Sequence, residues 1–171
     1  AYLFQDGLSQ EKNYERYNGR VNLDSKIANW VSAGINASAY RGINNDEYSG
    51  FGSLLQWANR IPPTVPIYNE DGSFHFNGLD NPVANQGNTG ISRTMDQQLN
   101  ATAYLNITPI EGLSIKGLYN LRHDYRETYS FKKNYVYGNE TSSKDSGKRE
   151  GSRYHYNWNW YTTQLVANYM K

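Results

Sequence analysis

The sequence lacks cysteine, a strong excess of either charge, and any long hydrophobic run. Without cysteine, neither a disulfide framework nor a thiolate zinc site can form. No run of about 18 apolar residues exists, which excludes a membrane-spanning helix. The net charge of +1 argues against a nucleic-acid partner bound through its phosphates. These absences exclude a disulfide scaffold, a thiolate zinc site and a spanning helix, and they argue against a nucleic-acid binder.

Catalytic and metal-binding patterns are also missing. His75, His123 and His155 lie far apart and in no known ligand spacing, so no metal or other cofactor is expected. The carboxylate pairs Asp46–Glu47 and Glu70–Asp71 stand beside turn residues, where we expect solvated loop charges rather than a hydrolase centre. The sequence therefore does not predict an enzyme.

Aromatic residues are abundant, with 16 Tyr and 4 Trp against 5 Phe. Rings with a polar tip suit boundaries between apolar and wet regions, and they also suit sugar-like ligands. The mean hydropathy of -0.84 is that of a hydrated protein. A transmembrane β-strand also has a low average, because lipid-facing apolar residues alternate with polar ones. Hydropathy alone therefore does not separate the two classes.

Alternation with a period of two is the strongest pattern in the chain. Five segments place apolar residues at odd positions and mostly polar residues at even positions. They are 17–24, 31–40, 98–107, 113–122 and 161–169. Runs of about 9 to 12 residues match a tilted strand that crosses a bilayer, whereas soluble sandwiches use about 5 or 6. The pattern predicts antiparallel strands of a large transmembrane β-barrel.

The predicted connections alternate in length. Short turns are expected at Asp24–Lys26 and Thr108–Gly112, and long irregular segments at roughly 42–96 and 132–153. Outer-membrane barrels have short periplasmic turns and long extracellular loops. Within the first long segment, one or two helical turns are expected over Gly50–Asn59, and a turn at Asp71–Gly72.

The order of several segments resembles the barrel of SusC/RagA-like TonB-dependent transporters. The segments are Tyr14–Asp24 (YERYNGRVNLD), Trp30 with Gly34–Asn36, Pro63–Ser73 (PTVPIYNEDGS), Asn81–Ala84 and Tyr104–Leu113 (YLNITPIEGL). On this resemblance, residues 1–171 are a partial barrel domain, without plug or signal peptide and incomplete at both ends.

The resemblance implies a function in the Gram-negative outer membrane. Members import oligosaccharides, peptides or similar nutrients with energy from TonB, which would act through a segment not present here. A SusD-like surface lipoprotein would be the partner, and outer-membrane lipid would surround the barrel. The alternative is a soluble all-β carbohydrate-binding module that holds sugar on exposed Tyr and Trp side chains.

Three sets of candidate residues follow from these predictions. For ligand binding we single out loop aromatics, with loop self-packing as the competing interpretation: Trp57, Tyr48, Phe51 and Tyr68. Even-numbered charged residues are expected to face the lumen: Arg20, Asp24, Lys116, Arg122, Asp124 and Arg126. An interfacial aromatic girdle is expected from Trp30, Tyr119, Tyr161 and Tyr169. Trp158 and Trp160 fit either the girdle or a loop platform.

Overall fold

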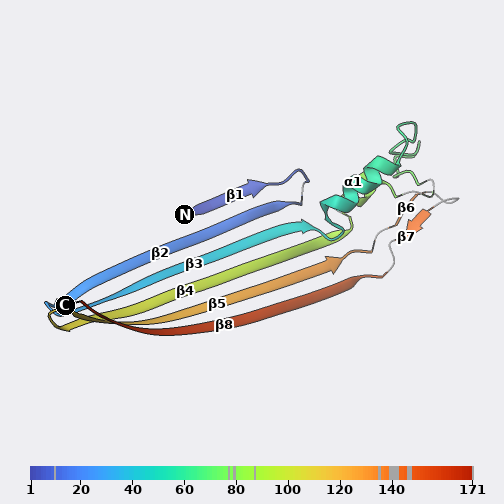
Figure 1. The fold of residues 1–171 in the computed structure, drawn as a ribbon. Coiled ribbons are helices and arrows are strands. Elements are labelled where there is room, and N and C mark those ends of the chain that lie inside the picture. Colours follow the sequence, from blue (N-terminus) through green and yellow to red (C-terminus); the bar gives the residue numbers. More distant parts are fainter. Residues whose placement is uncertain are drawn as a thin grey trace.

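The computed structural model consists of one open six-stranded antiparallel sheet, with loops and a small two-stranded sheet gathered at one of its ends (Figure 1). It describes residues 1–9, 11–76, 78, 80–86, 88–134, 136–138, 143–145 and 148–170. The sheet order is β1-β2-β3-β4-β5-β8. Its strands are β1 (Tyr2–Asp6), β2 (Asn13–Ala28), β3 (Val31–Glu47), β4 (Gly90–Ile110), β5 (Leu113–Lys132) and β8 (Glu150–Tyr169). The predicted all-β antiparallel class is confirmed.

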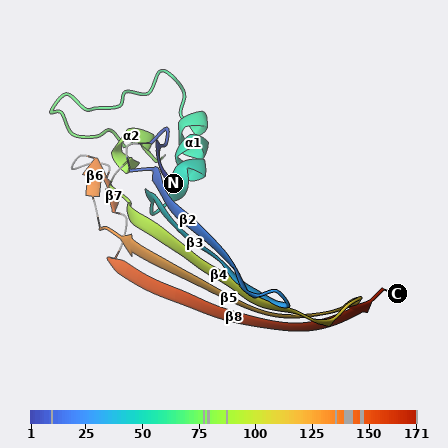
Figure 2. The same cartoon turned by 90° about the vertical axis from the view of Figure 1, so that its left-hand side faces the viewer.

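The sheet is a single curved layer (Figure 2). Short connections join β2 to β3 and β4 to β5 at one end, where the chain also terminates. The opposite end carries α1 (Gly50–Arg60), α2 (Pro82–Asn85) and the hairpin of β6 (Val136–Gly138) with β7 (Ser143–Asp145). The expected alternation of short turns and long connections is therefore present. Among the described helices, none is both long and apolar enough to cross a membrane.

Strand boundaries differ from the predicted ones. The turn expected at Asp24–Lys26 lies at residues 29–30, because β2 continues to Ala28 and stays paired with β3 through a register shift between Lys26 and Ala28. The predicted loop over 42–96 is shorter, since β3 extends to Glu47 and β4 begins at Gly90. In the second predicted loop, β5 extends to Lys132 and β8 begins at Glu150, while residues 135, 139–142 and 146–147 lie outside the described part. The expected helix is present as α1, and the Asp71–Gly72 turn closes a bridge between Tyr68 and Phe74.

Cross-strand register places the alternating residues of all long strands on two opposite faces. Leu23 pairs with Ile35, which pairs with Ala103, then Tyr119, then Thr163. The next odd row reads Val21, Ala37, Ala101, Leu121 and Tyr161. We call the surface made by these odd positions the apolar face. The even positions make the polar face, where Leu118 and Val166 are the apolar exceptions.

Almost no hydrophobic core exists in the described residues. Only Ile43 and Ala84 are buried apolar side chains, whereas Val21, Leu23 and Leu165 on the apolar face are 57% to 77% exposed. Monomeric soluble proteins rarely expose a contiguous apolar surface of this extent. The sheet therefore presents an apolar face for which the described chain provides no cover.

Candidate functional site

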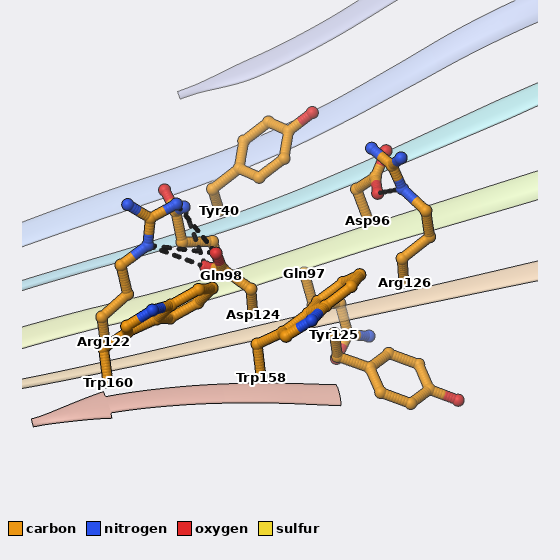
Figure 3. Close-up of a pocket in the computed structure, with 10 residues that line it drawn as sticks. All are labelled: Tyr40, Asp96, Gln97, Gln98, Arg122, Asp124, Tyr125, Arg126, Trp158 and Trp160. Carbon is orange, nitrogen blue, oxygen red and sulfur yellow. Dashed lines mark hydrogen bonds and ion pairs between the residues drawn. The ribbon is translucent and has the colours of Figure 1, made fainter. Parts of the chain in front are cut away.

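The polar face carries a shallow cavity at the middle of the sheet, shown in Figure 3. Its volume is about 450 Å³. Most of its lining comes from even positions of β3, β4, β5 and β8: Tyr40, Asp96, Gln98, Arg122, Asp124, Arg126, Trp158 and Trp160. The odd residues Gln97 and Tyr125 border it as well, and the Tyr125 ring points to the other side of the sheet. Side chains from four strands thus meet on one surface.

Two arginine–carboxylate pairs organise the charges of this cavity. Arg122 donates to both oxygens of Asp124, with its Nη2 2.8 Å from Oδ2, and the Gln98 amide donates to the same carboxylate at 2.9 Å. Arg126 pairs with Asp96 across β4 and β5, with Nε 2.5 Å from Oδ1. Each guanidinium in the cavity lining is matched by a carboxylate. The cavity therefore offers many polar groups with little net charge.

Four aromatic side chains follow one another along the polar face of β8. They are Tyr154, Tyr156, Trp158 and Trp160, and we call them the aromatic ladder. Tyr156 and Trp158 stack with ring centroids 5.5 Å apart and an interplanar angle of 10°. The Arg122 guanidinium lies 5.1 Å from the centroid of the Trp160 ring. All four rings remain 44% to 58% exposed, so they can still contact another molecule.

Nearer the short turns, the polar face has a second cluster around Tyr104. The Tyr104 hydroxyl donates to Asp24, two strands away, and Lys116 Nζ lies 5.3 Å from the ring centroid. Gly34 makes this possible because Tyr104 crosses it: a Cβ there would lie 2.5 Å from Tyr104 Cζ. An aromatic ring that covers a cross-strand glycine is a known stabilising device in sheets.

The six predicted charged residues all lie on the polar face. Arg122, Asp124 and Arg126 line the cavity, and Asp24 and Lys116 flank Tyr104. Arg20 stands in the same cross-strand row as Ser38, Asn100, Arg122 and Trp160. Sequence reasoning missed Asp96, Gln98 and Tyr40 as part of this group. It also left Trp158 and Trp160 undecided, although their even numbering alone places them opposite Tyr161.

The four loop aromatics do not line the cavity on the sheet. Phe51 and Trp57 belong to α1, and Tyr48 precedes it. Lys12 Nζ lies 5.7 Å from the Phe51 ring centroid, and Tyr68 stacks on Phe74 at 5.2 Å. For Phe51 and Tyr68 the structure thus shows contacts within the chain. In the same loop, the Ser73 hydroxyl and N–H both donate to Asp71, which lowers the pKa of that exposed carboxyl below its usual value.

The four predicted girdle residues are distributed over the turn-side half of the sheet. Trp30 lies in the β2–β3 turn, and Tyr169 pairs with Leu113 at the same end. Tyr119 and Tyr161 lie in the two rows described above, among Leu23, Val21 and their partners. All four are between 47% and 63% exposed.

The carboxylate pair Asp46–Glu47 does not form the solvated loop expected. Glu47 ends β3 and is only 1% exposed, and it accepts a hydrogen bond from the buried Ser9 hydroxyl. Its Oε2 has no partner among the described residues. Asp46 instead pairs with Lys12 at 3.3 Å. The strand runs further than the alternation indicated, and the β1–β2 connection folds over its end.

Comparison with known proteins identifies relatives of one kind. The chain is 31% identical over 129 residues to the TonB-dependent receptor P26 of Formosa agariphila. This alignment covers 70% of the chain and 12% of that receptor. It is 28% identical over 142 residues to the TonB-dependent receptor P3 of the same organism, covering 77% of this chain and 14% of the receptor. No family model matches.

The chain thus spans only about an eighth of the length of these relatives. Both alignments nevertheless extend over most of the chain, and the sheet is all-β and open, as a piece of a barrel wall would be. Together, the sequence similarity and the fold support the TonB-dependent receptor family for this chain.

Proposed function

We propose that the chain forms part of the barrel wall of an outer-membrane TonB-dependent transporter that imports nutrients, rather than an enzyme. The observation that carries the proposal is the separation of the two faces. The apolar face meets lipid in this proposal, and the polar face lines the lumen. Strands β3, β4 and β5 are hydrogen-bonded on both sides, which satisfies their backbone groups as the bilayer interior requires. In the proposed barrel, further strands would do the same for the open edges of β2 and β8.

The height of the apolar face supports a bilayer as its cover. Along β5 its apolar positions run from Leu113 to Leu121, and neighbouring strands add no charged side chain in these rows. This segment corresponds to about 27 Å of strand, or about 21 Å across the membrane at a tilt near 40°, close to the ~25 Å apolar band of such barrels. Beyond Leu99 the odd positions include polar and charged pairs, namely Arg41 with Gln97 and Asn45 with Arg93, and the apolar pair Ile43–Met95 lies between them.

The arrangement of the connections orients the wall. In the proposed orientation the turns at 29–30 and 111–112 face the periplasm, and α1, α2 and the β6–β7 hairpin face outward. Outward-facing loops are where a partner or incoming ligand first arrives. We place the wall in a Gram-negative outer membrane, because barrels of this type are found in that bilayer.

At finer detail we propose a SusC/RagA-like transporter. The resemblance of Tyr14–Asp24, Pro63–Ser73 and Tyr104–Leu113 to that subgroup supports this assignment. Oligosaccharides, peptides or similar nutrients would be the cargo, with a SusD-like lipoprotein over the outer mouth and TonB as the energy source. The wall segment described here supplies passage and shape, and Trp57, Tyr48, Phe51 and Tyr68 lie on the side where such a lipoprotein would dock.

Paired cysteine substitutions test the orientation of the two faces. The chain contains no cysteine, so the introduced thiol is the only one within it. Any cysteine elsewhere in the full-length transporter is first replaced by serine. Ala101→Cys on the apolar face and Asn100→Cys on the polar face should be introduced into the full-length transporter in outer-membrane vesicles. We expect a water-soluble maleimide to label position 100 and not 101, and a spin label at 101 to collide preferentially with oxygen. Equal labelling of both positions would reject the transmembrane wall and favour a soluble module.

A further inference from the structure

We propose that the aromatic ladder is a track for a carbohydrate chain, and that the sugar units in contact with it are uncharged. This inference rests on the proposed function, because it requires the polar face of β8 to face the lumen. The ladder comprises Tyr154, Tyr156, Trp158 and Trp160, alternating with residues of the opposite face.

The position of the ladder suits a route rather than a single pocket. Successive rings stand two residues apart, so the four rings extend for about 20 Å along the strand. Tyr154 pairs with Thr128 near the loop end, and Trp160 pairs with Arg122, one residue beyond Leu121 at the outer edge of the apolar band. The rings thus lead from the loop side of the sheet toward its middle.

The chemistry beside the ladder is that of sugar recognition. Aromatic faces bind the apolar faces of sugar rings, and hydroxyl groups need donors and acceptors at the ring edge. Next to Trp158 and Trp160 stand Gln98, Asp124 and Arg122, which offer both kinds of group. The polar face thus places planar polar side chains of β4 and β5 beside the aromatic rings of β8.

Charge pairing argues against an ionic ligand on the ladder. Arg122 is held by Asp124, and Arg126 by Asp96. A sulfate or carboxylate could reach the remaining N–H groups of either arginine, but the neighbouring aspartate would repel it and offset the attraction. An uncharged sugar can instead hydrogen-bond to the outer edges of both pairs without breaking them.

Three of the four rings also contact a neighbouring side chain before any ligand arrives. Tyr156 stacks on Trp158, and Arg122 covers one side of Trp160. Side chains fixed in this way lose little rotamer freedom on binding, which favours affinity. The alternative role as a lipid-facing girdle does not fit, since Trp158 and Trp160 share their face with Arg122, Asp124 and Arg126 (Figure 3).

Calorimetry on the full-length transporter in detergent tests the inference. The probes are maltohexaose, cellohexaose, laminarihexaose and xylohexaose as uncharged sugars, hexagalacturonate as a charged one, and hexaalanine as a peptide. We expect at least one uncharged sugar to bind, and Trp158→Ala or Trp160→Ala to weaken it by roughly twofold to tenfold each. Trp158→Phe should retain most of the affinity, whereas Trp158→Leu, which keeps an apolar side chain without a ring, should not.

The control variant is Asn157→Ala, next to Trp158 but with its side chain on the opposite face. It should leave binding unchanged. The inference is overturned if no uncharged hexasaccharide binds, if only hexagalacturonate or hexaalanine binds, or if sugar binding is indifferent to both Trp→Ala variants. These outcomes leave the proposed wall function standing, because the cysteine labelling at positions 100 and 101 tests that function separately.

Discussion

The two faces of the wall share one backbone and one set of cross-strand hydrogen bonds, yet they differ in almost every other respect. On the apolar face, Leu23, Ile35 and Ala103 follow one another across three strands without a polar contact. One residue further along, Asp24, Gly34 and Tyr104 form a hydrogen-bonded group. In a sheet of this kind the side-chain alternation, and not the fold, determines which environment each surface can meet.

The largest expected effect comes from placing a charge on each face at the same height. Ala103→Arg puts a guanidinium near the centre of the apolar face, and we expect it to lower the free energy of unfolding by about 2–4 kcal/mol. Thr102→Arg, its neighbour on the polar face, should change it by less than ~1 kcal/mol. The measurement is urea unfolding of the full-length transporter in lipid vesicles. Equal losses from both variants would contradict a lipid-facing surface.

The distinction between two faces ends at the loop side of the sheet, where buried polar residues create a third environment. Ser9→Ala removes the donor to Glu47, whose other carboxyl oxygen already has no partner among the described residues. Leaving a buried polar atom unsatisfied costs about 1–3 kcal/mol. We expect faster hydrogen exchange and proteolysis in the β1–β2 connection. Ser92→Ala, which removes a longer hydroxyl contact to Ser130, serves as the control.

The alternation of the sequence predicted the two faces but not the strand ends, and the reason is physical. Between Leu99 and Leu105 one face is apolar and the other polar, so the period of two is visible. From Gln97 to Arg93 both faces carry polar residues, and the pattern disappears while the hydrogen-bonded ladder continues to Gly90. The alternation in the sequence therefore predicts the length of the apolar band and not the length of the strand.

The candidate site was predictable in part for the same reason. Numbering alone placed Arg122, Asp124 and Arg126 on one face, because they lie two residues apart. Their partners Asp96 and Gln98 depend on the register between β4 and β5, which side-chain alternation within one strand does not determine. The burial of Glu47 depends on a contact with Ser9, 38 residues away in the chain.

A smaller effect is expected from alanine substitutions at two glycines of adjacent strands, of which only Gly34 has side chains packed over it. A Cβ at Gly34 would lie 2.5 Å from both Asp24 Oδ1 and Tyr104 Cζ, whereas one at Gly19 would meet nothing within 4 Å. Overpacking costs about 1–3 kcal/mol, and removal of a strand glycine returns about 0.5–1 kcal/mol. Gly34→Ala should therefore destabilise by roughly 0.5–2 kcal/mol, whereas Gly19→Ala should be neutral or stabilising. The same urea unfolding measures both, and a Gly34→Ala variant no less stable than Gly19→Ala would refute the role assigned to Tyr104.

The smallest effect is expected at the ion pair between Arg126 and Asp96, and its size tests how wet the polar face is. The side chains are 54% and 35% exposed, so solvent screens the pair despite the 2.5 Å separation. A double-mutant cycle with Arg126→Gln and Asp96→Asn should give a coupling energy of about 0.2–1 kcal/mol that falls as salt is raised. A coupling above ~2 kcal/mol that does not respond to salt would mean that the pair is desolvated. The polar face would then be covered by protein rather than open to water, and the cavity beside the aromatic ladder would be closed to a passing sugar.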